Sequence, residues 1–203
     1  MRRIGISQRI DAYPDRDERR DALDQRWAEL LWQCDILAMP LNSLCPDNTA
    51  YLDLLALDGY ILSGGNDIGQ APERDALEAA VLDHAVQNGL PVLGVCRGMQ
   101  FMNHHAGGQL RPVRGHVAQM HPITGPFADD YGLSTVNSYH GLGMVDADMG
   151  TGLNATAHSA DGIVEAFAHH NLPWLGIMWH PERNTPYDPQ DARIIQSHFR
   201  VNS

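Results

Sequence analysis

The sequence contains no lysine, and its 14 basic residues are all arginine. With 25 acidic residues, the formal net charge is −11 at pH 7. The absence of lysine excludes a lysine Schiff base to pyridoxal phosphate, a P-loop lysine and the strand lysine of protein kinases. The acidic balance also argues against a nucleic-acid partner, because binding a phosphate backbone needs a basic face.

Cysteines and long apolar runs are also scarce. Cys34, Cys45 and Cys96 form no CxxC pair, so neither a disulfide framework nor a cysteine zinc cage is expected. The first 20 residues contain no apolar run of the kind that follows the basic residues of a signal peptide, and no window approaches the ~20 apolar residues of a membrane span. We therefore expect a cytoplasmic protein with no membrane partner.

The 203 residues, 43% of them hydrophobic, are enough for one domain with a sizeable core, which we expect to cover residues 1–203. In the first half, apolar runs alternate with amphipathic segments in the order strand–helix, four times. The predicted strands are Arg3–Ser7, Ile36–Met39, Gly59–Leu62 and Pro91–Val95, and the predicted helices are Asp17–Gln33, Tyr51–Leu57, Pro72–Asn88 and Arg97–His105. This order predicts an α/β three-layer sandwich with a mainly parallel central sheet.

The second half of the sequence has a different character. Its predicted strands are Leu133–Ser138, Gly162–Ala168 and Leu175–Trp179, and a helix is predicted over Asp191–Arg200. The stretch Arg111–Tyr131 is rich in glycine, proline and histidine, and we expect a loop there that covers the site as a flap.

The most informative segment is Gly94-Val95-Cys96-Arg97-Gly98, in which a cysteine directly follows an apolar strand and opens an apolar-faced helix. This is a G-x-nucleophile-x-G elbow with cysteine in place of serine. A sharp turn strains the nucleophile's backbone, leaves room only for glycine beside it, and puts the sulfur at a helix N-terminus, which favours a thiolate. The alternative is an inert cysteine at an ordinary strand–helix junction.

A nucleophilic cysteine needs a base, and the second signal supplies one. His180 follows the apolar strand that ends at Trp179, and Glu182 comes two residues later, beyond Pro181. A carboxylate beside an imidazole fixes its tautomer and stabilises the imidazolium, which is the role of the third member of a triad. Taken alone, this segment could be a loop with a local ion pair, but it supplies the base that the elbow lacks.

A third signal is Ser63-Gly64-Gly65-Asn66-Asp67, which follows the strand Gly59–Leu62. A Gly-Gly turn leaves backbone N–H groups free to face an anion, and with the N–H of Arg97 it could form an oxyanion hole. A tight turn without such a role explains the same residues equally well.

The combination of Cys-x-Gly-x-Gln after a strand, an upstream Gly-Gly and a late His-Pro-Glu resembles the class I glutamine amidotransferase-like superfamily over nearly the whole chain. The resemblance implies a flavodoxin-like fold and a triad of Cys96, His180 and Glu182. It also implies an oxyanion hole formed by Gly65 and Arg97, recognition of the glutamyl group by Gln100, and no cofactor.

Within this superfamily, Cys-Arg-Gly-Met-Gln, Glu-Arg-Asp at residues 73–75 and Val-Asn-Ser-Tyr-His at 136–140 resemble the γ-glutamyl amide hydrolase branch. IGISQR, LDGYILSGGND and IMWHPER are similar to γ-glutamyl-CDP-amidate hydrolases, which release cytidine diphosphoramidate for the decoration of capsular polysaccharides. The resemblance implies a small γ-glutamyl substrate cleaved through a thioester. The candidate substrate-binding residues are Gln100, Asn66, Ser138, Tyr139 and His140. The chain could be a monomer or a homodimer.

Other activities on this scaffold remain open from the sequence. The alternatives are a γ-glutamyl-γ-aminobutyrate-type hydrolase, a glutaminase subunit that passes ammonia to a synthase, and a catalytically silent regulator. Arg97 speaks against the second, because amidotransferase subunits usually carry leucine or glycine there, and the intact triad speaks against the third. If the leaving group carries phosphates, the guanidinium groups of Arg97 and Arg9 are candidates to bind them, with structural ion pairs as the alternative.

Several histidines and one glutamate have no assigned role. His116 and His121 lie in the expected flap, but their spacing matches no known cage, so we expect no metal site. His140 could border the pocket, without a role in proton transfer. Glu165 lies on an apolar strand, and we expect it to be buried with a partner such as Arg74, with a position pointing into the site as the alternative.

Overall fold

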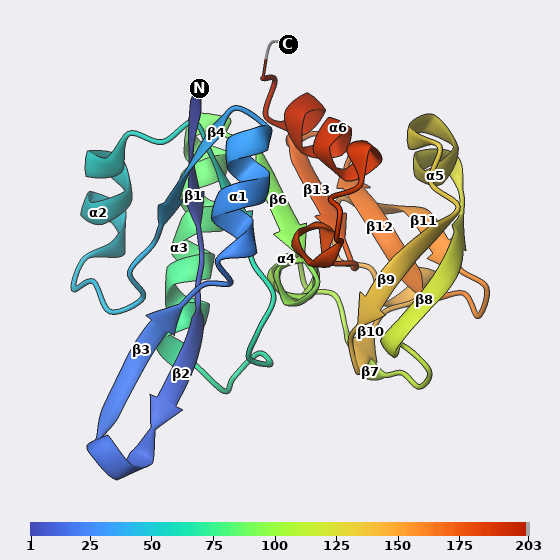
Figure 1. Cartoon of the computed structure of the whole chain (residues 1–203). Helices are drawn as coiled ribbons and strands as arrows, with labels where there is room; N and C mark the ends of the chain where they lie inside the picture. Colours follow the sequence, from blue (N-terminus) through green and yellow to red (C-terminus); the bar gives the residue numbers. More distant parts are fainter. Residues whose placement is uncertain (202–203) are drawn as a thin grey trace.

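One half of the central sheet is parallel, as the sequence predicts. The computed structural model describes residues 1–201, and within them nine strands form this sheet in the order β4-β1-β5-β6-β13-β12-β11-β8-β9 (Figure 1). The parallel half contains β4 (Ile36–Pro40), β1 (Arg2–Ile6), β5 (Gly59–Leu62), β6 (Val92–Val95) and β13 (Trp174–Ile177). Their carboxyl ends share one edge, and sites in such sheets form there.

The other half of the sheet is antiparallel. It contains β12 (Val164–His169), β11 (Leu153–Ser159), β8 (Val117–Thr124) and β9 (Thr135–Tyr139). Of the nine strands of this sheet, β12 and β8 run against the other seven. The predicted α/β sandwich with a mainly parallel sheet is therefore confirmed.

Helices cover both faces of the sheet and close two apolar clusters. One face packs against α1 (Arg26–Gln33) and α6 (Pro189–His198), and the other against α2 (Asn48–Leu55), α3 (Pro72–Asn88) and α4 (Arg97–His105). The short helix α5 (Pro126–Tyr131) lies beside β8 and β11 (Figure 1). None of the helices formed by residues 1–201 combines the length and the apolar character that a membrane crossing requires.

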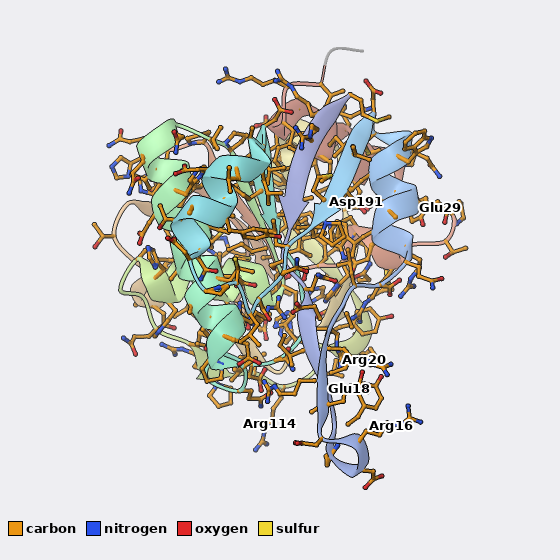
Figure 2. All side chains as sticks on the ribbon, turned by 90° about the vertical axis from the view of Figure 1, so that its left-hand side faces the viewer. Arg16, Glu18, Arg20, Glu29, Arg114 and Asp191 are labelled. Atoms are coloured by element: carbon orange, nitrogen blue, oxygen red, sulfur yellow. The ribbon has the colours of Figure 1, made fainter. Side chains whose placement is uncertain are left out.

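The helix predicted over Asp17–Gln33 is wrong in its first half. The chain instead forms an antiparallel hairpin of β2 (Arg9–Tyr13) and β3 (Glu18–Ala22), joined by the short helix η1 (Pro14–Arg16), and α1 begins only at Arg26. The sequence ERRDA offers no apolar stripe to bury, so pairing its backbone with β2 satisfies its hydrogen bonds instead. The hairpin protrudes from the body, with Arg16, Glu18 and Arg20 towards its far end (Figures 1 and 2).

The loop predicted over Arg111–Tyr131 is also wrong. This stretch contains β7 (Arg111–Pro112), β8 and α5, and β7 pairs with β10 (Leu142–Gly143). Most side chains of β8 are exposed, so the strand shows no apolar alternation in the sequence. Strands β10 and β11 were not predicted either, whereas the other predicted strands and helices lie within a few residues of their predicted bounds.

Candidate active site

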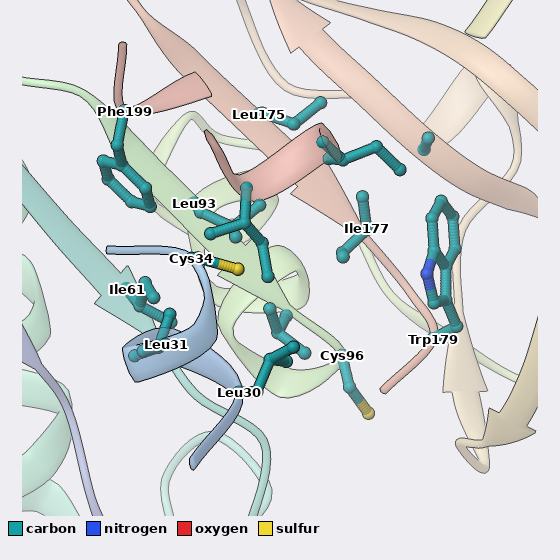
Figure 3. Packing of buried hydrophobic residues seen from close by; sticks show 14 of the residues in the cluster. Leu30, Leu31, Cys34, Ile61, Leu93, Cys96, Leu175, Ile177, Trp179 and Phe199 are labelled. Carbon is teal, nitrogen blue, oxygen red and sulfur yellow. The ribbon is translucent and has the colours of Figure 1, made fainter. Parts of the chain in front are cut away.

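The sharp turn predicted between strand and helix is present at Cys96. The residue lies between β6 and α4 with φ 52° and ψ −107°, a strained backbone for a residue with a side chain. A Cβ at Gly98 would collide with the carbonyl oxygen of Leu62, so only glycine allows α4 to approach β5 this closely. Figure 3 shows the sulfur pointing away from the neighbouring apolar side chains. The backbone geometry of the elbow is thus confirmed.

Parallel pairing brings His180 to the same edge as the elbow. Val95 of β6 pairs with Ile177 of β13, and the N–H of Cys96 donates to the Ile177 carbonyl at 2.8 Å. His180 follows three residues later, directly before the short helix η3 (Pro181–Arg183). Its Nδ1 lies 2.7 Å from Oε1 of Glu182. All three side chains are at least nine-tenths buried, with 2–7% of each residue exposed. The imidazole therefore has a fixed partner on its Nδ1 side.

The protonation of His180 depends on its two neighbours. Burial by itself disfavours the imidazolium, but hydrogen bonding to Cys96 and to Glu182 outweighs it and raises the pKa of His180 to about 9. The raised pKa favours the imidazolium, with the carboxylate of Glu182 on its Nδ1 side.

Asn137 fixes the backbone of His180 from β9. Its Nδ2 donates to the carbonyl of His180 at 2.8 Å, and its Oδ1 accepts from the N–H of His180 at 2.9 Å. A second bond joins Nδ2 to Oδ1 of Asn184 at 2.9 Å. We did not select Asn137 from the sequence, although it lies in the Val-Asn-Ser-Tyr-His motif that indicated the hydrolase branch.

The Gly-Gly turn packs directly against the imidazole. A Cβ at Gly64 would lie 2.6 Å from Cε1 of His180, so glycine is required for this close approach. From the other side, Arg74 donates to the carbonyls of Ser63 at 2.6 Å and Gly64 at 3.1 Å. These carbonyls are turned towards the buried guanidinium and away from the imidazole side of the turn. Arg74 is thus a second positioning residue that sequence analysis missed.

The side chain of Arg97 does not face a substrate, and the expectation that it binds phosphate is wrong. Its guanidinium is 2% exposed and pairs with Glu78 and Asp75 of α3, while its Nε donates to the carbonyl of Asn66 at 3.1 Å. These partners hold the side chain below the Gly-Gly turn. Only the backbone N–H of Arg97, at the first turn of α4, remains a candidate for the site.

Two predicted substrate-binding residues are occupied elsewhere. Asn66 accepts from the N–H of Ile10 at 2.8 Å and donates to its carbonyl at 2.9 Å, so its amide ties the turn to β2. The hydroxyl of Ser138 is buried and donates to the carbonyl of His116 at 2.6 Å. We therefore correct both assignments. The side chains of Asn66 and Ser138 bind backbone groups of Ile10 and His116 and stabilise the fold, and we no longer assign them to substrate recognition.

The other predicted substrate-binding residues lie in different surroundings. Tyr139 is 42% exposed and its ring packs edge-on against His180, with ring centres 5.8 Å apart. Gln100 is buried near the elbow, where its Nε2 donates to the Leu142 carbonyl at 2.8 Å. His140 is buried and turned towards Glu165, away from a position that borders the site.

The expected partner of Glu165 is also different. Arg74 pairs with Glu78, through Nε and Oε1 at 2.8 Å, and Glu165 lies on β12 among histidine side chains instead. Sequence analysis could not show this, because the histidines come from distant segments.

A cavity borders the imidazole and the Gly-Gly turn. Its lining includes Arg9, Trp27, Gly64, Gly65, His180, Glu182 and Arg183. A larger cavity is lined by Asn137, Trp179 and residues 184–191, and neither Cys96 nor His180 is among its lining residues. Because His180 and Glu182 line the smaller cavity, we place the candidate site there, with Arg9 and Arg183 also among its lining residues.

Comparisons with known proteins bear on the family of this chain. The family model described as peptidase C26 matches residues 4–182. The chain is 30% identical over 207 residues to the gamma-glutamyl-CDP-amidate hydrolase of Campylobacter jejuni, covering 98% of each protein. It is also 30% identical over 150 residues to a gamma-glutamyl-gamma-aminobutyrate hydrolase of Escherichia coli O157:H7, covering 60% of this chain and 57% of the relative.

The solved structures confirm the fold. The glutaminase domain of Trypanosoma brucei CTPS, determined with bound acivicin, superimposes with a TM-score of 0.70 at 17% identity and covers 100% of this chain and 96% of that one. The elbow, the parallel half-sheet and the full-length match agree, and the chain belongs to the peptidase C26 family, whose architecture is that of class I glutamine amidotransferases.

Proposed function

We propose that this protein is a cysteine-dependent hydrolase that cleaves a γ-glutamyl amide bond and releases glutamate. The observation that carries the proposal is the alignment at one sheet edge of Cys96 on a strained elbow and His180 held by Glu182. The peptidase C26 match and the similarity to two kinds of γ-glutamyl hydrolase support this class of substrate.

The reaction starts with the thiolate of Cys96 attacking the γ-carbonyl carbon of the substrate, which forms a C–S bond and a tetrahedral oxyanion. The backbone N–H groups of Gly65 and Arg97 stabilise that oxygen. His180 then donates its proton to the leaving nitrogen as the C–N bond breaks, and a γ-glutamyl thioester remains on Cys96.

Water completes the reaction. His180, now neutral, takes a proton from a water molecule whose oxygen attacks the thioester carbonyl, and the C–S bond breaks to release glutamate and restore the thiolate. Glu182 keeps the imidazole in the correct tautomer and orientation through both steps. Asn137 and Gly64 support this geometry by fixing the backbone and one face of His180.

For the leaving group we propose cytidine diphosphoramidate, so that the substrate is γ-glutamyl-CDP-amidate. Full-length similarity to the Campylobacter jejuni enzyme supports this choice over γ-glutamyl-γ-aminobutyrate, for which the similarity covers only 60% of the chain. Two arginines that line the cavity, Arg9 and Arg183, suit the charge of a diphosphate. The side chain of Arg9 is 56% exposed, and its Nε pairs with Oδ1 of Asp11 at 2.7 Å, so the ion pair that the sequence offered as the alternative is present.

The reaction class is tested by measuring glutamate release by mass spectrometry from glutamine, γ-glutamyl-γ-aminobutyrate, γ-glutamylputrescine and γ-glutamyl-CDP-amidate. We expect the last to be hydrolysed with the highest kcat/KM, and Cys96→Ala to lower kcat at least about 10³-fold. A diazoketone analogue of glutamine should label Cys96 and spare Cys34 and Cys45, which serve as internal controls. Unchanged hydrolysis by Cys96→Ala would show that another residue is the nucleophile.

The leaving group is tested by Arg9→Ala and Arg183→Ala. Each should raise KM for γ-glutamyl-CDP-amidate about tenfold, the value of one lost charged contact, and leave KM for γ-glutamyl-γ-aminobutyrate unchanged. Arg16→Ala is the matched control, because Arg16 lies towards the far end of the protruding hairpin (Figure 2). Equal changes for both substrates would exclude a phosphate-binding role for these arginines.

A further inference from the structure

A buried group of three histidines and one glutamate lies in the antiparallel half of the sheet, outside the site described above. The histidine–glutamate cluster consists of His116 before β8, His121 on β8, His140 after β9 and Glu165 on β12. Each side chain offers one ligand atom, and these four atoms all lie within 4.8 Å of one another. Three segments of the sequence, 116–121 and those around His140 and Glu165, therefore direct metal-binding atoms to one point.

The distances within the cluster are those of atoms around a common centre. Oε1 of Glu165 lies 3.6 Å from Nδ1 of His116, 3.5 Å from Nε2 of His121 and 3.5 Å from Nε2 of His140. These separations exceed the roughly 2.7–3.2 Å of an N–H···O hydrogen bond. They approach the ligand–ligand distance of about 3.3–3.4 Å in a tetrahedron whose metal–ligand bonds are about 2.0–2.1 Å long.

The outward nitrogens of two histidines fix which ring atom carries the proton. Nε2 of His116 lies 2.9 Å from Oδ2 of Asp161, and Nδ1 of His140 lies 2.9 Å from the carbonyl oxygen of Leu142. Both partners are acceptors, so each outward nitrogen is the N–H donor and the inward nitrogen of a neutral ring presents a lone pair. Carboxylate and carbonyl partners of this kind orient histidines that bind metals in proteins.

The inward nitrogens of the three histidines have no hydrogen-bond partner. Within residues 1–201, the inward nitrogens of His116, His121 and His140 and both carboxylate oxygens of Glu165 are buried without a hydrogen-bond partner. Glu165 is 0% exposed, and His116 and His140 are each 3% exposed. Burying a carboxylate against lone pairs is costly, and a cation at the centre removes that cost by binding all four atoms at once.

We propose that the histidine–glutamate cluster is a metal site that binds one Zn²⁺ ion through three imidazole nitrogens and one carboxylate oxygen. Imidazole ligands favour a transition metal over Ca²⁺ or Mg²⁺, which take oxygen ligands, and four convergent ligands match the tetrahedral preference of Zn²⁺. Four protein ligands leave no open position for a substrate or a reactive water, so the ion holds the structure together and performs no chemistry.

The site would connect the antiparallel half of the sheet to the catalytic edge. His140 is adjacent to Tyr139, whose ring packs on His180, and the carbonyl of Glu165 accepts from the N–H of Met178 at 2.8 Å, two residues before His180. Metal binding therefore fixes β8 and β9 against β12 beside the segment that carries the catalytic histidine.

The proposal is tested with Zn²⁺ alone on the full chain. Protein dialysed against a chelator and reloaded should retain one zinc per chain after desalting, measured by inductively coupled plasma mass spectrometry. Glu165→Gln and His121→Ala should lose this zinc, and Asp161→Asn should weaken its affinity about 10–100-fold. His158→Ala is the matched control, because His158 also faces a carboxylate, that of Asp146 at 2.6 Å, and lies outside the cluster.

Two further measurements distinguish zinc held by the cluster from zinc held elsewhere on the chain. Cys96→Ser should retain the zinc, which separates the cluster from binding at the catalytic thiol. Cobalt-loaded protein should show the visible absorption of tetrahedral Co²⁺, and His121→Cys should add a sulfur-to-cobalt charge-transfer band, which reports direct ligation even if the alanine variant fails to fold. Absence of retained zinc, or equal retention in wild type, Glu165→Gln and His121→Ala, would overturn the proposal.

Discussion

The two halves of the sheet treat buried charge in opposite ways. In the parallel half, the guanidinium groups of Arg74 and Arg97 lie between Glu78, Asp75 and the carbonyls of the Gly-Gly turn, so each charged group has partners. In the antiparallel half, Glu165 faces the inward nitrogens of three histidines, and neither of its carboxylate oxygens has a hydrogen-bond partner among the described residues. The comparison teaches that Arg74, Arg97 and Glu78 are paired within the polypeptide, whereas the proposed cation completes the pairing of Glu165.

The largest expected effect lies at the catalytic edge of the parallel half. Glu182→Gln should lower kcat roughly 10³- to 10⁴-fold, because an amide no longer stabilises the imidazolium or fixes its tautomer. Steady-state kinetics on the best substrate of the panel measures this, with Glu18→Gln on the hairpin as the control. A loss of less than tenfold would remove Glu182 from the triad.

The pairing of buried charges in the parallel half is tested by Glu78→Ala. Glu78 is 0% exposed and pairs with both Arg74 and Arg97, so its removal leaves two buried cations without a shared carboxylate. We expect a loss of about 3–5 kcal/mol in the free energy of unfolding, measured by urea denaturation. Glu73→Ala, one residue before Arg74 at the exposed start of α3, should cost less than about 1 kcal/mol. Equal losses would contradict the contrast between the halves.

The proposed Zn²⁺ ion in the antiparallel half predicts a smaller effect on stability, one that depends on the metal. At a free Zn²⁺ concentration 100-fold above its dissociation constant, wild-type protein should gain about 2.7 kcal/mol in stability over the chelated protein. The gain should appear as a higher Tm in thermal denaturation and should be absent from Glu165→Gln. Glu78→Ala should keep the metal-dependent gain, because its defect lies in the other half. A gain of equal size in Glu165→Gln would break the comparison.

The smallest expected effect is on the pH dependence of activity. Because the pKa of His180 is raised from 6.5 to about 9, the imidazolium persists at neutral pH and is lost as pH rises through about 9. We expect kcat/KM to fall along an alkaline limb near that pH, and the limb to move towards lower pH in Glu182→Gln. The stabilisation from this raised pKa is complete below about 6.5 and disappears as pH rises through about 9. An alkaline limb that Glu182→Gln leaves unmoved would contradict this assignment.

The parallel half could be predicted from the sequence because its signals are local. Short apolar strands, helix-spaced apolar residues and a glycine on either side of Cys96 specify strand, turn and helix within a few residues. Of the mispredicted segments, β3 has no fully buried side chain and β8 exposes most of its side chains, and both pair through backbone groups. Their structure depends on a partner strand, which a window of sequence does not contain.

Site residues divide in the same way. The position of Cys96 on its elbow follows from its immediate neighbours, whereas the inward orientation of Arg97 follows from Asp75 and Glu78 on the preceding helix. The histidine–glutamate cluster is the extreme case. His116 and His121 lie close together in the sequence, but His140 and Glu165 come from later segments, and only the strand order β12-β11-β8-β9 brings all four together. For that reason the sequence led to an expectation of no metal site.

Two guanidinium groups below the Gly-Gly turn bind the carbonyl oxygens of Ser63, Gly64 and Asn66. A loop anchored in this way has its shape before any substrate arrives, so its dipoles need no rearrangement during a turnover. Because the Gly-Gly turn is rigid, the choice of leaving group depends on the other residues that line the cavity. Relatives could then accept a different amine by exchanging those residues while keeping the same reactive centre.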